Sequence, residues 1–484
     1  MNPRYAQYRC VRCGGELFLA APVSIQCGSC PHSYPVIGEV PILTLRPVAL
    51  VAVAVQALRN TATKIRNLSS TYDDQTDIDS LQVPFRRRAE RALAGMRANL
   101  ALTETYLKPA ESLIREHNPQ LDFLDRISNC GGGWSPEEML PYFYQDWGGT
   151  QDFAAVRTRL LDAVLQHRSD AEAVAVLGAG ACGLVQALAP EFEYAYGVDL
   201  SLATLLIARG VLSGDTVVVH LDQADWRTVE LRNREPPSPN VRLLVADAAD
   251  LPFADNSISA VVTQYMLDVV GNADAIAREI HRVLKPGGIW FDFSRPPRLS
   301  TQPDEFGRRS LEELPSFLQP NGLRLIDSSH VRFTLLNLTA ISPDILTVQH
   351  DVHAFIARRA PGGVEISATG DGTRFHGDDA GWWRQVPEVA ALHRVCLASA
   401  KTYSPGGPTR HNEISFGQGR CRVSADDAHR LESVLELIDG KRTIREIYAR
   451  FVAQGFETNS AEFRELLHYL DSRHGAVRLG TRPQ

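Results

Sequence analysis

The sequence predicts an α/β protein whose largest unit is a parallel sheet covered by helices, and three observations support this prediction. Between residues 131 and 360, apolar stretches of strand length alternate with helical stretches, which is typical of βαβ units. One of these strands, at residues 174–177, runs directly into a G-x-G-x-x-G loop at residues 178–183. Asp199 then closes the next apolar strand, 21 residues after the first glycine, where such folds bind ribose hydroxyls.

The composition is that of an ordinary globular protein. The chain has 484 residues, of which 44% are hydrophobic and 22% charged, so we expect two to four domains at about 100–200 residues each. A net charge of −7 and an isoelectric point of about 6.1 disfavour binding of nucleic acid through a broadly basic surface. The polar start of the chain and its short apolar runs predict no membrane span and a reducing, cytoplasmic compartment.

The chain divides into five predicted segments. They are a cysteine-rich module at residues 1–46, a polar helical connector at residues 47–130, the α/β domain at residues 131–360, a linker with one helix at residues 361–405, and a last small unit at residues 406–484.

Four of the eight cysteines are paired as Cys10/Cys13 and Cys27/Cys30, with thirteen residues between the pairs. Two such C-x2-C knuckles can bring four thiolates to the corners of a tetrahedron, which suits zinc. A closed set of four thiolates leaves no coordination position for substrate, so the expected zinc is structural. A metal-free or redox module is the alternative interpretation.

The residues around these knuckles carry a first resemblance. The segment at residues 8–17, the second knuckle and the run Tyr-Pro-Val-Ile-Gly-Glu-Val-Pro-Ile-Leu at residues 34–43 resemble the small zinc ribbons that activate methyltransferases. The resemblance covers about 40 residues. It implies a domain that packs against a catalytic partner, here in the same chain.

The glycine loop and Asp199 together predict a nucleotide-type cofactor. Gly178, Gly180 and Gly183 let the backbone approach a ligand closely, and the Asp199 carboxylate can accept hydrogen bonds from two ribose hydroxyls. This arrangement serves NAD and S-adenosylmethionine (SAM) alike, so a nicotinamide-dependent dehydrogenase is one alternative. A second alternative is that the glycines serve only the packing of strand against helix.

Three later segments favour SAM. Asp247 closes a third strand, where its carboxylate can bind an adenine amino group, although it could instead cap the following segment. A fourth strand at residues 259–264 opens on the cleft, and a helix from residue 280 ends at Pro286, before a fifth strand. In this order the set resembles the class I SAM-dependent methyltransferases. The resemblance implies a Rossmann-like, seven-stranded methyltransferase sheet. The expected cofactor-binding residues are Gly178, Ala179, Gly180, Gly183, Asp199, Leu200, Asp247, Ala248 and Gln264.

Within that class, residues 139–360 resemble the carnosine N-methyltransferase-like family. The likeness rests mainly on the runs at residues 144–148, 260–272 and 284–290. The family's substrate-binding aspartate carries over to Asp268, whose carboxylate can hold an N–H group and orient the opposite nitrogen. Asp268 and Tyr265 are the expected proton acceptors. A helix N-cap is the alternative role for Asp268.

Two departures argue against carnosine itself as the substrate. The family's arginine falls on Phe153, and its substrate-contacting histidine falls on Leu299. Arg295 and Arg298 instead put positive charge near the predicted cleft, which suits an acceptor that carries a carboxylate. They could equally be solvated loop charges.

The C-terminal unit has the pattern of three short helices and a terminal strand. Thr443 and Glu446 form a capping-box pattern that opens the second helix, and residues 476–479 can form the strand. The run Ile-Asp-Gly-Lys-Arg-Thr-Ile-Arg-Glu-Ile at residues 438–447 resembles the winged-helix units related to PqqD. That resemblance implies recognition of a leader peptide; a purely structural winged helix is the alternative.

These expectations combine into an enzyme that transfers a methyl group from SAM, in line, to a nitrogen or oxygen of a peptide or small amino-acid-like substrate. Because the sulfonium is already activated, catalysis needs mainly positioning and desolvation of the acceptor. The alternatives are an RNA methyltransferase whose zinc ribbon binds RNA and a non-catalytic scaffold that binds SAM.

Overall fold

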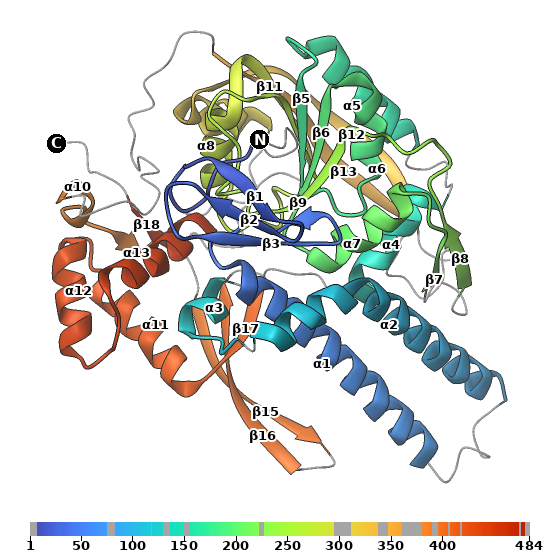
Figure 1. The fold of residues 1–484 in the computed structure, drawn as a ribbon, viewed down its shortest axis with the longest axis horizontal. Helices are drawn as coiled ribbons and strands as arrows, with labels where there is room; N and C mark the ends of the chain where they lie inside the picture. The colour runs from blue at the N-terminus through green and yellow to red at the C-terminus, as the bar shows by residue number, and fades with distance from the viewer. Residues whose placement is uncertain are drawn as a thin grey trace.

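The structure is a computed structural model of the chain, shown in Figure 1. It describes residues 7–74, 83–117, 119–128, 136–148, 154–221, 227–294, 311–336, 347–360, 380–389, 395–404, 407–416, 419–473 and 476–479. Within these ranges, no helix combines the length and the apolar character that crossing a bilayer requires.

A seven-stranded sheet forms the centre of the molecule, which confirms the predicted Rossmann-like α/β class. The spatial order is β12-β13-β11-β10-β5-β6-β9, with β13 antiparallel to both neighbours and the five strands from β11 to β9 parallel. The strands are β5 (Ala173–Leu177), β6 (Tyr194–Asp199), β9 (Val241–Val245), β10 (Ile258–Gln264), β11 (Leu284–Ser294), β12 (Leu323–Leu336) and β13 (Thr347–Arg359).

The strand order reverses between β5 and β10, because the chain first builds β5, β6 and β9 outward and then returns to place β10 on the other side of β5. Ligands of open α/β sheets bind at this switch point, beside the carboxyl ends of the strands. The topology therefore places the glycine loop, which follows β5, at the expected ligand site.

The sheet separates two apolar cores. Along β5, Ala173, Ala175 and Leu177 belong to one core and Val174 and Val176 to the other, as the two-residue period of a strand requires. The second core includes side chains of α4 (Pro136–Trp147), α5 (Ala154–His167), α6 (Gly183–Leu188) and α7 (Leu202–Leu212). The first includes α8 (Ala273–Val283) and α9 (Leu314–Leu318), together with side chains from both ends of the chain.

Helix α8 ends earlier than the sequence predicted. Its N-cap is Asn272, whose side chain accepts a hydrogen bond from the backbone N–H of Ala275, and its last residue is Val283 rather than Pro286. A proline disfavours the helical conformation at the residue before it, so Lys285 cannot extend the helix. Strand β11 begins immediately, with Leu284 beside Ile258 of β10.

The N-terminal module is a small sheet of β1 (Leu17–Ala21), β2 (Ser24–Cys27), β3 (Ser33–Ile37) and β4 (Val40–Pro41). Just beyond β4, Ile42 forms a parallel bridge with Val245 of β9, and the Leu43 N–H donates to the Val245 carbonyl at 2.8 Å. Tyr8 forms a second bridge, with Phe253. The module thus packs on the α/β domain of its own chain.

Two long helices follow the module, α1 (Pro47–Asp74) and α2 (Val83–His117), and lie side by side in Figure 1. The Asn99 side chain on α2 donates to the His220 carbonyl at 2.7 Å and accepts from the His220 N–H at 2.9 Å. These bonds hold the hairpin of β7 (Val217–Leu221) and β8 (Arg227–Leu231) against α2. A short helix, α3 (Phe123–Ser128), comes next.

The C-terminal unit contains α11 (Ala425–Leu437), α12 (Ile444–Ala453) and α13 (Ser460–His468), and a terminal strand β18 (Val477–Arg478). The predicted Thr443–Glu446 capping box opens α12. Strand β18 pairs with β14 (Glu388–Val389), which follows α10 (Ala380–Trp383) inside the segment predicted as a linker. A separate sheet joins β15 (Val395–Ser404), β16 (Gly407–Phe416) and β17 (Gly419–Val423).

Candidate cofactor and metal sites

The glycine loop leaves β5 in a conformation that favours glycine. Gly178 and Gly180 have φ angles of 65° and 51°, in the left-handed region where a side chain is strained. A Cβ on Gly178 would also lie only 3.0 Å from Cγ of Met266, in the turn after β10. The Ala179 N–H donates to the Val198 carbonyl of β6 at 3.0 Å. The loop is therefore held between the ends of β6 and β10.

Asp199, which closes β6 and which the sequence predicted as a ribose-binding residue, is hydrogen-bonded to this loop. One carboxylate oxygen accepts from the Gly180 N–H at 2.9 Å, and the other accepts from the Ser201 N–H at 2.8 Å. Burial raises the pKa of the Asp199 carboxyl, while the surrounding backbone N–H groups lower it. Each carboxylate oxygen can accept more than one hydrogen bond, so the group can also bind ribose hydroxyls.

Asp146 and Trp147 of α4 contact the loop, and the sequence had assigned no site role to either. An Asp146 carboxylate oxygen accepts from the Gly183 N–H at 2.8 Å, and the Trp147 indole N–H donates to the Ala181 carbonyl at 2.8 Å. A Cβ on Gly183 would lie 2.7 Å from Cγ of Asp146. Burial raises the pKa of Asp146 to about 6, against the lowering effect of the Gly183 N–H.

The start of α6 explains why the loop needs the Asp146 carboxylate. Cys182 occupies the N-cap position of α6 with φ of 66° and makes no side-chain cap. The first N–H groups of such a helix need acceptors from elsewhere. Burial and the carboxylates of Asp199 and Asp146 raise the pKa of the Cys182 thiol well above its usual range, which supports a packing role for it.

Leu200 and Asp247, two of the expected cofactor-binding residues, line one cleft. No helix follows Asp247 directly. Its carboxylate accepts from the Ala249 N–H at 2.9 Å, and its carbonyl accepts from the Asp250 N–H at 3.0 Å. It therefore stabilises a turn rather than capping a helix. Ala248, inside that turn, packs against the first core.

The end of β10 carries the residues expected near the acceptor. Gln264 is partly exposed and pairs with Phe293 of β11. Tyr265 has φ of 48°, and its ring packs edge-on against Phe293 with centroids 5.9 Å apart. Asp268 is buried in the turn that follows. It is not the N-cap of α8, because Asn272 has that role.

A second buried carboxyl, Asp292 near the end of β11, was missed by the sequence analysis. One of its oxygens accepts from the Thr263 hydroxyl at 2.6 Å and from the Ser294 hydroxyl at 2.9 Å. Burial, with a smaller contribution from the charge of Asp268, raises the pKa of Asp292 to about 8 despite these bonds. Two interacting carboxyls thus lie at the carboxyl ends of β10 and β11. The predicted substrate residues Arg295 and Arg298 lie outside the described residues.

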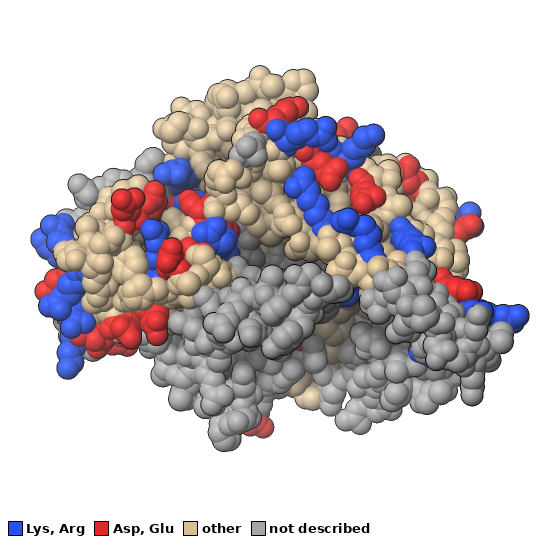
Figure 2. Space-filling view, turned by 90° about the horizontal axis from the view of Figure 1, so that it is seen from below, with Lys and Arg blue, Asp and Glu red and all other residues tan. Residues whose placement is uncertain are grey.

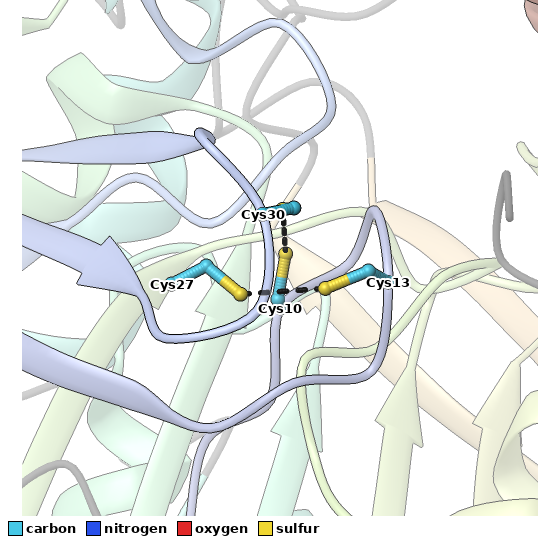
Figure 3. A group of neighbouring side chains, drawn as sticks. All are labelled: Cys10, Cys13, Cys27 and Cys30. Carbon is cyan, nitrogen blue, oxygen red and sulfur yellow. Dashed lines mark hydrogen bonds between the residues drawn. The ribbon is translucent and has the colours of Figure 1, made fainter.

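The four cysteines of the N-terminal module converge (Figure 3). Their sulfur atoms all lie within 4.8 Å of one another, with 3.7 Å between Cys10 and Cys30 and 3.3 Å between Cys13 and Cys27. A tetrahedral zinc with Zn–S bonds of about 2.3 Å requires S···S separations of about 3.8 Å. The cluster therefore has about the size of a four-thiolate zinc site.

The surroundings of the sulfurs also fit thiolate ligands. The Gly15 N–H donates to Sγ of Cys13 at 3.4 Å, and the Ser29 N–H donates to Sγ of Cys27 at 3.3 Å. The Tyr34 hydroxyl lies 3.0 Å from Sγ of Cys10. Hydrogen bonds of this kind orient metal ligands and stabilise their negative charge.

Comparison with known families identifies the central part of the chain. Residues 176–291 match the family model described as "Methyltransferase domain". This segment runs from β5 to β11 and contains the glycine loop, Asp199, Asp247 and Asp268. The chain thus contains a class I, SAM-dependent methyltransferase domain. This match does not support the alternative of a nicotinamide-dependent dehydrogenase.

Curated relatives match parts of the same domain. The chain is 42% identical over 118 residues to a demethylmenaquinone methyltransferase of Corynebacterium kroppenstedtii, covering 24% of this chain and 49% of the relative. It is 32% identical over 105 residues to a 2-phytyl-1,4-naphtoquinone methyltransferase of Nostoc punctiforme, covering 21% of this chain and 37% of the relative. The chain thus spans less than half the length of either relative.

Solved structures show similarity at lower identity. The YcgJ protein of Bacillus subtilis is 16% identical, with a TM-score of 0.31 over 43% of this chain and 100% of that one. A complex of the Haloferax volcanii Trm112 methyltransferase activator with a candidate methyltransferase gives 18% identity and a TM-score of 0.33, over 47% of this chain and 97% of that one.

Proposed function

We propose that this protein is a SAM-dependent methyltransferase. The observation that carries the proposal is the hydrogen bond between the Asp199 carboxylate and the glycine loop, inside the segment that matches the methyltransferase family. Together they form a backbone cradle beside an acceptor for ribose hydroxyls, at the switch point of the sheet.

The residues of the chain have separate tasks in this proposal. Bound SAM supplies a methyl group already activated on a sulfonium sulfur. The backbone at Gly178–Gly180 approaches the cofactor closely, Asp199 holds its ribose and Asp247 accepts from its adenine amino group. Asp146 and Trp147 keep the loop in place, so little reorganisation is needed when the ligand binds. Asp268 and Tyr265 orient the acceptor and accept its proton.

For the acceptor we propose a nitrogen, or an oxygen, of a peptide or small amino-acid-like molecule. Support comes from the buried Asp268 carboxyl, because a carboxylate can hold an N–H group and accept the proton released when nitrogen is methylated. The likeness of residues 260–272 to carnosine N-methyltransferases points the same way, although carnosine itself is not expected. Arg295 and Arg298 would bind a carboxylate on the acceptor.

The C-terminal unit would bind a leader peptide if its likeness to PqqD-related units reflects shared function. The zinc ribbon would hold one structural zinc through Cys10, Cys13, Cys27 and Cys30.

An RNA substrate is less well supported. On the face shown in Figure 2, acidic side chains are interspersed with the basic ones over the described residues, and the net charge is −7.

A second candidate is methylation of a ring carbon of a quinone-type molecule. It is favoured by the names of the curated relatives, which include the demethylmenaquinone methyltransferase of Corynebacterium kroppenstedtii. The two candidates are distinguished by incubating the full chain with SAM and either a peptide and amino-acid library or a demethylated quinol. Mass spectrometry then locates the added methyl group, and a methyl group on quinone carbon alone would replace the nitrogen proposal.

Calorimetric titration of the full chain with SAM tests the core of the proposal. Replacement of Asp199 by alanine removes acceptors of charge-assisted hydrogen bonds, so we expect SAM binding to weaken by about 30-fold or more, equivalent to about 2 kcal/mol. The matched control is Asp162→Ala, at an exposed position on α5, which should bind SAM as the unaltered protein does. Absence of SAM binding to the unaltered protein would refute the proposal.

A further inference from the structure

The cleft that contains Leu200 and Asp247 has walls from four parts of the chain, one of which is Leu50 of α1. The methyltransferase domain contributes these two residues and Asp250, the segment after β4 contributes residues 43–46, and the C-terminal unit contributes His468 and Tyr469. The cleft is narrow: the space open to the centre of a water-sized molecule is about 20 Å³, and the whole space between its atoms, open solvent included, is about 400 Å³. Two predicted cofactor residues therefore share a cavity with a domain far away in the sequence.

Polar contacts attach the C-terminal unit at this position. The Arg46 guanidinium donates to Glu465 of α13 at 2.5 Å and to Asp125 of α3 at 2.8 Å. The Arg126 guanidinium makes a two-pronged contact with Asp427 of α11, at 2.6 and 3.0 Å. Arg46 lies within one of the segments that line the cleft, so the attachment and the cleft are contiguous.

A further contact ties the unit to the loop that follows Asp268. The Asn272 side chain donates to the Asp471 carbonyl at 2.7 Å, while its oxygen caps α8. Apolar residues of α11, α12 and α13 belong to the same core as α8 and the N-terminal module. In Figure 1, α13 (red) lies between the blue N-terminal module and α12.

His468 and Tyr469 are positioned where α13 passes into a π-helical turn at Tyr469–Arg473. The Ser472 hydroxyl donates to the His468 carbonyl at 2.8 Å and lies 3.3 Å from Nε2 of the imidazole. Tyr469 is buried. One helix end therefore places two aromatic rings in the lining of the cleft, with centroids 6.0 Å apart and planes tilted by 56°.

The chemical character of adenine matches this set of side chains. Its faces are flat and apolar, its exocyclic amino group is a hydrogen-bond donor, and small-ligand pockets combine apolar walls with a few placed polar groups. We infer that His468 and Tyr469 of the C-terminal unit form one wall of the adenine pocket opposite Leu200 and Asp247, so that SAM binding and docking of this unit reinforce each other. The inference rests on the proposed function, and the mutual reinforcement follows because a coupling free energy acts equally in both directions.

Titration of full-length variants with two ligands tests the inference. For His468→Ala we expect SAM and adenosine each to bind about tenfold more weakly, because both ligands carry the adenine that loses its aromatic contact. His468→Phe keeps a flat ring and should bind both within about twofold of the unaltered protein. His429→Ala, on α11 outside the cleft lining, is the matched control and should change neither affinity.

Equal binding of both ligands to His468→Ala and to the unaltered protein would overturn the inference, while leaving the proposed function intact. Loss of SAM binding by the alanine variant with adenosine binding unchanged would overturn it too. If His468→Ala fails to fold, the unaltered chain still gives a decisive measurement by hydrogen–deuterium exchange with and without S-adenosylhomocysteine, the demethylated cofactor.

In that experiment we expect residues 465–473 to exchange at least about threefold more slowly with the ligand, together with the glycine loop, because the ligand stabilises the docked unit. Protection of the glycine loop without protection of residues 465–473 would contradict the inference alone. No protection in either region, together with no SAM binding in calorimetry, would mean that the proposed function itself has failed.

Discussion

At the scale of single residues, the site depends on acidic side chains that bind the backbone of the glycine loop. Asp146 and Asp199 each accept a hydrogen bond from a different glycine of the loop, Gly183 and Gly180. Asp199 follows Gly180 by 19 residues, whereas Asp146 precedes Gly183 by 37 residues and lies on a different helix, α4. The Asp199 contact could be predicted from a known local pattern, whereas the Asp146 contact depends on how α4 packs.

Asp292 should make the stability of the protein pH-dependent. Its folded pKa of about 8 lies above the ordinary value near 3.9 for an unfolded chain. The native state therefore binds more protons, and the stability from this group is complete below about pH 4 and is lost as the pH rises through about 8. Asp292→Asn stays neutral and keeps an oxygen for Thr263 and Ser294.

We therefore expect Asp292→Asn to match the unaltered protein at pH 4.5 and to exceed its unfolding free energy by about 2 kcal/mol or more at pH 9. Denaturant unfolding across this pH range is the measurement. Asp162→Asn, at an exposed position, should show no such divergence. If the difference in unfolding free energy between Asp292→Asn and the unaltered protein did not vary with pH, the raised pKa of Asp292 would not contribute to the stability of the fold.

At the scale of secondary-structure elements, local patterns were sufficient for the parallel strands of the central sheet and for the cap of α12. Strand β5 was predicted because an apolar run ends in glycine, and the start of α12 because Thr443 and Glu446 have capping-box spacing. Local patterns could not show which elements meet. Strand β14 has two residues and acquires its role only by pairing with β18, and the bridge from Ile42 to Val245 joins two separate sheets.

The cysteine cluster gives an element-scale prediction. We expect one zinc per chain in the purified protein by atomic emission, and none in Cys13→Ser, because three thiolates hold zinc much less well than four. Cys396→Ser alters a cysteine outside the cluster and should retain the metal. Removal of zinc should lower the thermal midpoint, since folding of the module and metal binding are coupled.

A protein that purifies without zinc, and that neither gains zinc nor changes its thermal midpoint when zinc is added, would contradict the metal assignment. Partial loss of SAM binding in Cys13→Ser is also expected, because the module leads directly into residues 43–46, which line the cleft.

At the scale of the whole molecule, the ends of the chain come together around the methyltransferase domain. Side chains of the N-terminal module, α8 and the C-terminal helices belong to one apolar core. The contact between Arg126 and Asp427 joins residues 301 apart. Contacts of this range leave no trace in local sequence patterns, which explains why the cysteine module and the C-terminal unit were recognised separately but their shared cleft was not.

The Arg126 contact provides a test of this arrangement. Arg126→Ala leaves the buried Asp427 carboxylate without its cation, so we expect docking of the C-terminal unit to weaken by about 1–2 kcal/mol, allowing for solvent screening at the partly exposed guanidinium. Hydrogen exchange should then quicken in residues 425–473 and stay unchanged in β5 and β10. Arg445→Ala, exposed on α12, is the control, and equal exchange in both variants would refute the role of this contact.

The attachment of the cysteine module through Ile42 and Leu43 has a consequence for assembly. As two separate proteins, the module and the methyltransferase domain would meet only as often as their concentrations in the cell allowed. A covalent tether replaces that encounter by an intramolecular one, with an effective concentration that reaches the millimolar range for short linkers. The pairing of Leu43 with Val245 should therefore persist at any dilution, and no separate supply of the module is needed.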